Sequence, residues 1–336
     1  MMKLSKKQNY LETIRCGAPE ALAVDWDGIA NLRDPASGNS NITSREPYYD
    51  RWGVKWGFTD EKVARSACVL PGGSPVKDIT HWRDYVTIPN VEDIDFSRTV
   101  AEASQVDRSE NLLCISCVQG LFERAHFLLG FEDCLADFLE EPEYMEEILD
   151  VITEHKLALL DRAYRELKMD AVFFHDDWGS KYSLFMSPAT WREFIKPREA
   201  KIIAHVKSLG DGNILFIHHS DSFLEPLIPE MIEIGIDVWQ GCIPQNDLVR
   251  LQKDFHGKIG FMGGIDIAAI DHADCPEEAV RAEVRRAIDT YAPHGGMVVG
   301  IPSIAALNRN VQDIYMDELR SYTAKYNAEH FGCTKG

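Results

Sequence analysis

Two short polar clusters contain residues that could bind a metal or transfer a proton. The first, His218-His219-Ser220-Asp221, offers two imidazoles and a carboxylate within four residues. These are nitrogen and oxygen ligands for one divalent metal. His219 and Asp221 are two positions apart and point to the same side if a strand continues through them. The alternative is that one histidine hydrogen-bonds in the core while Asp221 caps the next helix.

The second cluster is His175-Asp176-Asp177. Adjacent carboxylates are costly to crowd at a buried strand end, because like charges repel, unless the site uses them. Such a group can act as general acid and base, and we predict all three residues as catalytic. The alternative is a solvated loop in which one aspartate caps a turn. Two such clusters in one chain favour the catalytic interpretation.

The cysteines add little to either cluster. Cys242 follows a predicted strand and is either a soft metal ligand or a plain loop thiol. Cys114 and Cys117 form a C-x-x-C inside an apolar run with no second pair at zinc-ribbon spacing. We therefore expect these two to be buried structural thiols.

Aromatic and amide side chains complete the candidate site. Tyr49, Trp52, Trp56 and Trp178 could line a pocket for a small substrate, although aromatic residues more often belong to a core. Gln240 stands at the end of a predicted strand. We assign these five residues to substrate binding.

The elements that must position these residues are short apolar runs alternating with amphipathic stretches. We expect strands over residues 20–28, 111–119, 169–177, 212–221, 235–241, 257–264 and 295–302. Strands that alternate with helices imply a parallel sheet, either a (β/α)₈ barrel or a doubly wound sheet. The polar clusters follow strand ends, where barrels carry active sites, and no glycine-rich phosphate loop follows any strand. We therefore predict an α/β TIM barrel.

One domain accounts for the whole chain, residues 1–336. Residues 29–110 mix turn formers with aromatic residues and lack the strand–helix alternation. We expect them to be an N-terminal elaboration packed on the barrel. The oligomeric state, monomer or homodimer, stays open.

Composition excludes several classes of partner. The chain has 35 Lys+Arg against 54 Asp+Glu, a net charge of −19, which disfavours nucleic acid and anionic membranes as partners.

No apolar run approaches the ~20 residues of a membrane span, and the basic N-terminus lacks the apolar stretch of a secretory signal. Eight cysteines without a framework spacing are typical of reduced thiols. We expect a cytoplasmic protein.

Several stretches together resemble the uroporphyrinogen decarboxylase superfamily. They are DRWGVKWG (50–57), HDDWG…SPATWREFIKP (175–197), ILFIHHSDSFLEPLIPEMIEIGIDVWQG (214–241), GKIGFMGGID (257–266) and a Gly-Gly pair near 295. This resemblance covers most of the chain and implies a (β/α)₈ barrel. The superfamily's decarboxylases have an N-terminal arginine motif of the kind RQAGRY, where this chain offers only Arg33. Together with the net charge of −19, this disfavours a polycarboxylate substrate.

The other branch of the superfamily contains corrinoid-dependent methyltransferases, which bind zinc through a His-x-Cys and a later cysteine. Here Ser220 or Asp221 replaces the first cysteine, and Ser303 stands near the second. A metal would therefore have the harder ligands His219, Asp221 and His218, with Cys242 as the nearby sulfur, so the ligand set does not establish zinc.

This chain is most similar to the anaerobic demethylase-like members of the superfamily. The resemblance implies transfer of a methyl group from a small methylated donor, of aryl methyl ether or methylamine type, to the corrinoid of a partner protein. Two alternatives are a cofactor-free decarboxylase that uses the aspartate pair and a catalytically silent barrel that binds a ligand.

Overall fold

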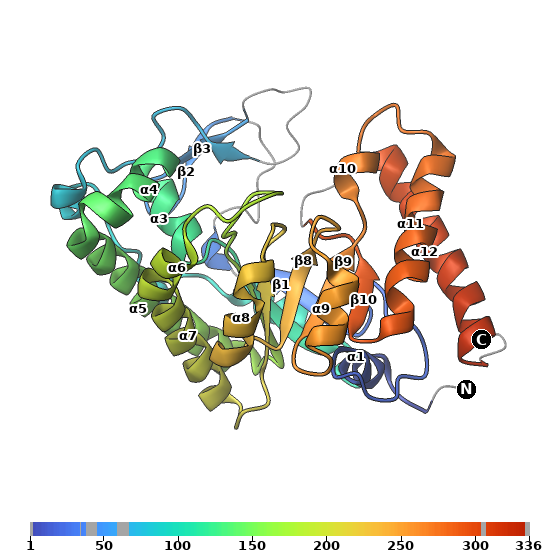
Figure 1. The fold of residues 1–336 in the computed structure, drawn as a ribbon. Coiled ribbons are helices and arrows are strands. Elements are labelled where there is room, and N and C mark those ends of the chain that lie inside the picture. Colours follow the sequence, from blue (N-terminus) through green and yellow to red (C-terminus); the bar gives the residue numbers. More distant parts are fainter. Residues whose placement is uncertain (1–2, 34, 38–45, 59–66, 304–306, 333–336) are drawn as a thin grey trace.

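The computed structural model describes residues 3–33, 35–37, 46–58, 67–303 and 307–332. Its centre is a parallel sheet of seven strands in the order β1-β5-β6-β7-β8-β9-β10 (Figure 1). These strands are β1 (Ile29–Arg33), β5 (Leu112–Cys117), β6 (Ala171–His175), β7 (Leu215–His219), β8 (Val238–Cys242), β9 (Gly260–Gly264) and β10 (Met297–Gly300).

Helices connect these strands and pack around the curled sheet (Figure 1). This confirms the predicted α/β fold of the TIM-barrel type. The helices are α1 (Lys6–Ile14), α2 (Ser97–Ala103), α3 (Leu121–Leu129), α4 (Phe131–Glu140), α5 (Pro142–Leu167), α6 (Pro188–Phe194), α7 (Lys196–Leu209), α8 (Ile228–Ile234), α9 (Leu248–Asp254), α10 (Ile267–Ile270), α11 (Glu277–Tyr291) and α12 (Arg309–His330).

Side chains of each strand alternate between the barrel interior and the helix layer. In β6, Ala171 and Phe173 belong to the inner apolar cluster, whereas Val172 and Phe174 belong to the outer cluster that meets the helices. This is the two-residue period of an extended chain. The same alternation sends His175 inward and decides which polar residues can meet at the barrel mouth.

The first predicted strand, residues 20–28, is mostly absent. Only Val24 forms a bridge, to Val299 of β10, and the regular strand begins at Ile29. Asp25 and Gly28 have φ of +46° and +88°, conformations that interrupt an extended run. A side chain at Gly28 would also lie 2.7 Å from the Lys6 carbonyl oxygen. The strand that pairs with β5 is therefore displaced toward the C-terminus.

The N-terminal elaboration begins later than predicted, because Ile29–Arg33 is β1 of the barrel sheet rather than part of an insertion. Beyond it lies a small antiparallel sheet of β2 (Tyr48–Tyr49), β3 (Lys55–Gly57) and β4 (Cys68–Val69). Trp56 of β3 meets Phe127 of α3 edge to face, with ring centroids 4.8 Å apart. Such contacts pack this sheet against the helices near the barrel mouth.

Helix α1 covers the amino ends of the strands (Figure 1). Its Tyr10 and Ile14 join the inner apolar cluster, and a side chain at Gly260 would lie 2.6 Å from Ile14 Cβ. The opposite end, where the strands finish, is left for polar residues. Within the described part of the chain, no helix combines the length and apolarity needed to cross a membrane.

Candidate functional site

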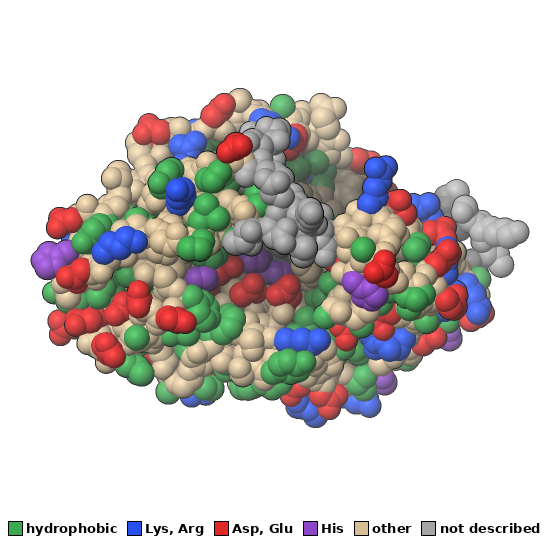
Figure 2. Space-filling view, turned by 90° about the horizontal axis from the view of Figure 1, so that it is seen from above, with side chains coloured by type: hydrophobic (Ala, Val, Ile, Leu, Met, Phe, Trp, Pro, Cys, Tyr) green, Lys and Arg blue, Asp and Glu red, His purple; other side chains and the backbone are tan. Residues whose placement is uncertain are grey.

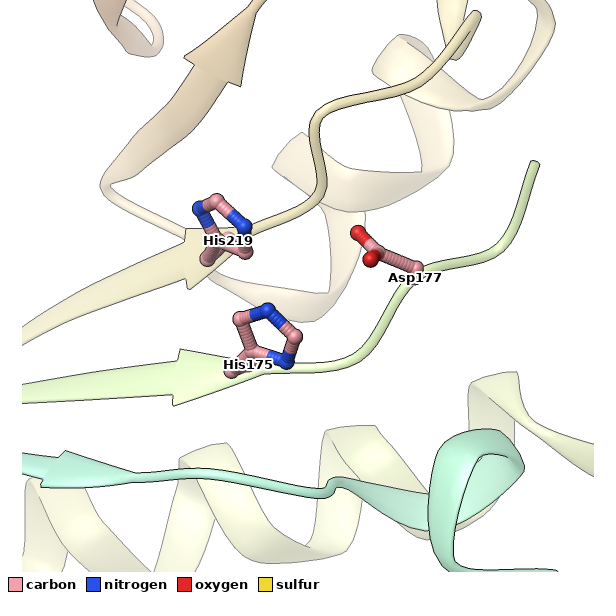
Figure 3. A group of neighbouring side chains, drawn as sticks. All are labelled: His175, Asp177 and His219. Atoms are coloured by element: carbon pink, nitrogen blue, oxygen red, sulfur yellow. The ribbon is translucent and has the colours of Figure 1, made fainter. Parts of the chain in front are cut away.

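Three potential metal ligands meet where β6 and β7 end. His175 and His219 are paired in the parallel register of these strands, and Asp177 follows His175 by two residues. Ligand atoms of His175, Asp177 and His219 lie within 4.8 Å of one another. Figure 3 shows the three side chains converging on one space. The two imidazole rings are stacked, with centroids 4.3 Å apart.

Gln240 fixes the orientation and tautomer of His219. Its amide nitrogen donates to the carbonyl oxygens of Ile301 and Pro302, at 3.3 and 3.1 Å. The amide oxygen of Gln240 therefore faces His219 Nδ1 and accepts a hydrogen bond from it. With the proton on Nδ1, Nε2 of His219 keeps a lone pair for a metal.

Glu123 of α3 fixes the orientation and tautomer of His175. Its Oε2 lies 2.6 Å from Nδ1 of His175, and both side chains are buried. An ionised carboxylate has no proton to donate, so it accepts this hydrogen bond and Nδ1 carries the proton. Nε2 is then the nitrogen of His175 that faces the possible metal. A carboxylate–histidine pair of this kind is common behind metal ligands.

The electrostatics distinguish the two histidines. Burial, together with the nearby His175, lowers the pKa of His219 to about 3, which keeps His219 neutral. Burial alone would also lower the pKa of His175, but the Glu123 carboxylate outweighs it and the pKa rises to about 9. Burial and the neighbouring Asp177 raise the pKa of Asp221 to about 7. A metal at this site would have to displace a proton from His175.

The donor set suits a divalent cation. Two imidazole nitrogens and a carboxylate oxygen are the ligands of many catalytic zinc sites, at bond lengths of about 2.0–2.2 Å. Three protein ligands leave a position open for substrate, and two histidines with one carboxylate also suit ferrous iron. Figure 2 shows acidic and histidine side chains gathered in the hollow of this face. The residues therefore fit a catalytic metal without a thiolate.

Asp176 has a different environment from its neighbours. Its carboxylate accepts the backbone N–H groups of Phe122 and Glu123, at 3.1 and 2.8 Å, and the Trp178 indole N–H at 2.9 Å. It thus caps the start of α3. Burial, with the charge of Glu123 second, raises the pKa of Asp176 to about 7. The predicted Asp176–Asp177 pair is split because consecutive residues of an extended chain face opposite sides.

His218 points away from the barrel interior. Its Nδ1 lies 2.7 Å from Oε1 of Glu199 on α7, and both side chains are fully buried. Trp178 packs on its ring at 4.0 Å between centroids. The structure therefore places His219, but not His218, with His175 and Asp177 in the group of potential metal ligands.

Cys242 and Asp221 also lie outside the ligand cluster. A register shift between Gln240 and Cys242 turns the thiol into the outer apolar layer, where it donates to the Trp239 carbonyl oxygen at 3.2 Å. Burial raises the pKa of Cys242, which opposes a thiolate ligand. Asp221 donates its backbone N–H to Asp177 Oδ1 at 3.2 Å and remains next to the cluster.

The predicted aromatic substrate residues are dispersed. Trp52, Trp56 and Trp178 are buried, and Trp178 packs edge to face on Trp191 between the sheet and α6. Tyr49 is 67% exposed. None of these aromatic rings contacts a ring of the metal cluster within the described residues, so the structure does not bring these four together with it.

Two residues near the cluster were not predicted from the sequence. Glu123 lies in an apolar helical stretch, 52 positions before its partner His175, and only its charge in that setting could have marked it. Trp26 packs on Phe173 at 5.4 Å between ring centroids, and Phe173 packs on His219 at 5.3 Å. Trp26 therefore lies in the barrel interior below the metal cluster.

Comparisons with known proteins agree with this architecture. A family model described as uroporphyrinogen decarboxylase (URO-D) matches residues 73–301. Uroporphyrinogen decarboxylases of Burkholderia pseudomallei and Aromatoleum aromaticum are 27% identical over 165 and 164 residues. Each alignment spans 48% of this chain and 42% of the relative, so the chain matches less than half the length of these curated relatives.

A solved structure is similar over nearly the whole chain. It is described as a methyltransferase from Methanosarcina mazei and has a TM-score of 0.66 at 16% sequence identity. The match covers 96% of this chain and 99% of that one. At this level of identity the similarity establishes the shared fold.

Proposed function

The chain belongs to the uroporphyrinogen decarboxylase family, and from this premise we propose that it is a methyltransferase within that enzyme family. The donor is a small methylated compound, of aryl methyl ether or methylamine type, and the acceptor is a corrinoid protein. The observation that carries this proposal is the cluster of His175, Asp177 and His219 at the barrel mouth. The methyltransferase of similar fold supports it.

In this proposal His175, Asp177 and His219 hold a divalent cation, with zinc as the expected ion. When bound, the cation supplies Lewis acidity to the oxygen or nitrogen that loses the methyl group. Glu123 and Gln240 keep the two imidazoles in the orientation that exposes Nε2. Asp221, beside Asp177, is placed to hold a proton for the departing heteroatom.

The arrangement favours methyl transfer over decarboxylation without a cofactor. A metal-free decarboxylase needs binding groups for carboxylates and an acid, but not two neighbouring histidines whose free nitrogens converge. Both histidines here have a hydrogen-bond partner that fixes the tautomer suited to metal binding. The names of the curated relatives nevertheless make a carboxy-lyase the second candidate.

The test combines metal analysis with a methyl-transfer assay. Purified protein is loaded with zinc or ferrous iron and mixed with corrinoid proteins reduced to Co(I) and a panel of aryl methyl ethers and methylamines. We expect the absorbance of the methylated corrinoid to appear with at least one donor. Release of carbon dioxide from a carboxylate substrate, with no corrinoid requirement, would instead identify a carboxy-lyase. Ligand binding without turnover in either assay would indicate a silent barrel.

Replacing Glu123 by glutamine tests the support behind His175. Loss of the carboxylate should weaken metal binding about 10–100-fold, because the imidazole loses its charged hydrogen-bond partner. The dissociation constant is measured by competition with a chelator. Glu132→Gln, at an exposed position of α4, is the matched control and should leave the constant unchanged. Equal affinities in the two variants would contradict a metal at His175.

A further inference from the structure

A second polar pocket lies at the same end of the barrel. Its volume is about 10 Å³, and its lining includes Val118, directly after β5, with Arg124 of α3 and Lys156 of α5. Trp52 and His155 also line it. Arg124 follows Glu123 in α3. Glu123 bonds to His175 of the potential metal site, and Arg124 lines this pocket.

The positive charge of Arg124 is already balanced. Its Nη1 lies 2.7 Å from Oδ2 of Asp50, and both side chains are buried. Asp50 also accepts the backbone N–H groups of Trp52 and Val54 and the indole N–H of Trp56. The carboxylate of Asp50 is therefore fully engaged and has no capacity for a second cation.

Lys156 is a buried cation that forms no ion pair with the residues that the structure describes. The residue is 5% exposed, and its ammonium donates to the Val118 carbonyl oxygen at 3.2 Å. Among the described residues no carboxylate forms an ion pair with it. Glu123 is near enough to feel its charge, but Oε2 of Glu123 is bonded to His175. A buried charge is costly unless an opposite charge and hydrogen bonds compensate it.

His155 adds an unpaired polar group to the same pocket. Both of its ring nitrogens are buried and have no hydrogen-bond partner among the described residues. Its ring meets Trp52 edge to face, with centroids 4.9 Å apart. Burial, with the charges of Lys156 and Arg124, lowers the pKa of His155 to about 3. The neutral ring therefore offers one N–H donor to a group in the pocket.

We infer that Lys156 and His155, beside the Arg124–Asp50 ion pair, form a site for a small anionic group. The cavity admits about one water-sized group, which fits a single carboxylate oxygen or a halide ion. A neutral water could satisfy the nitrogens of His155 but would not balance the charge of Lys156. The anion is either a carboxylate of the substrate or a free inorganic ion. Anion binding does not depend on the proposed function, whereas its assignment to a substrate carboxylate does.

Thermal unfolding of the full chain tests this site. Midpoints are measured for the wild type and Lys156→Met in a buffer of low anion content and during titration with sodium formate, sodium benzoate or sodium bromide. Lys201→Met, at an exposed position of α7, is the control. At a ligand concentration of about 100 times Kd, wild type and control should gain roughly 3–5 °C more than Lys156→Met. Comparing variants within one salt removes general salt effects.

The unfolding midpoints measured before any anion is added test the same inference a second time. Without added anion, Lys156→Met should unfold at or above the wild-type temperature, because the buried unpaired charge is gone. A response to formate and benzoate but not bromide supports a substrate carboxylate, and an equal response to all three supports an inorganic ion. In the latter case a crystal soaked in bromide shows anomalous density between Lys156 and His155. Identical titrations of wild type and Lys156→Met would overturn the inference and leave a water in the pocket.

Discussion

His219→Ala will purify without bound metal and will lose methyl transfer by about 10³-fold or more. In the proposed site this histidine supplies one of three ligands, and a bound cation would contribute several kcal/mol to stabilising developing charge. Metal per chain is measured by plasma mass spectrometry, and the rate by methylation of the corrinoid partner. Asp177→Asn should give the same result with a smaller change in side-chain volume.

The matched control is His205→Ala, which removes a partly exposed imidazole of α7 that is paired with Asp161. It should keep both metal and rate. Full metal content in His219→Ala and Asp177→Asn would contradict the ligand assignment. Normal metal content with no transfer to any corrinoid protein would leave the metal site standing and remove the methyltransferase proposal.

His218→Ala will retain the metal but will lower the free energy of unfolding by about 3–5 kcal/mol. The substitution removes the partner of a fully buried carboxylate, Glu199, and leaves it without a hydrogen bond from His218. Urea denaturation gives the free energy, and metal analysis of the folded fraction gives the occupancy. Neighbouring histidines would thus have separate roles, one in metal binding and one in stability.

A double variant distinguishes the lost ion pair from a lost side-chain volume. Replacing both partners by apolar residues, as in His218→Leu with Glu199→Met, should recover much of the stability, because no buried charge is left unpaired. A loss below about 1 kcal/mol in His218→Ala would contradict the assigned role of the Glu199–His218 pair. Loss of metal in His218→Ala would show that His218 and His219 act together in metal binding.

Much of the barrel could be predicted from the chain because local patterns determine it. Six of the seven predicted strands overlap β5 to β10, since each is an apolar run bounded by turn residues. The exception lies at residues 20–28, where backbone turns at Asp25 and Gly28 interrupt an apolar run. The composition of residues 20–28 favours a strand. The close approach of the Gly28 backbone to Lys6, which leaves no room for a side chain, is seen only in the folded structure.

The site is harder to predict because it depends on pairing between strands. Adjacency in the chain groups His175 with Asp176 and Asp177, and the two-residue period of a strand groups His219 with Asp221 of its own segment. The neighbour of His219 in space is His175, through the register of β6 and β7. Register is a property of the folded sheet and cannot be read from one segment. The same limitation hides Glu123, which reaches His175 of β6 from helix α3.

The cap that Asp176 forms on α3 has a consequence for how this barrel can change over time. Strand β6 carries His175, and the next residue holds the first turn of the helix that carries Glu123. The distance between His175 and Glu123 is thus set by a contact between their own sequence neighbours. Substitutions at exposed positions of α4 and α5, which lie between them in the chain, leave this contact in place. The outer surface of these helices can thus vary while the inner geometry is kept.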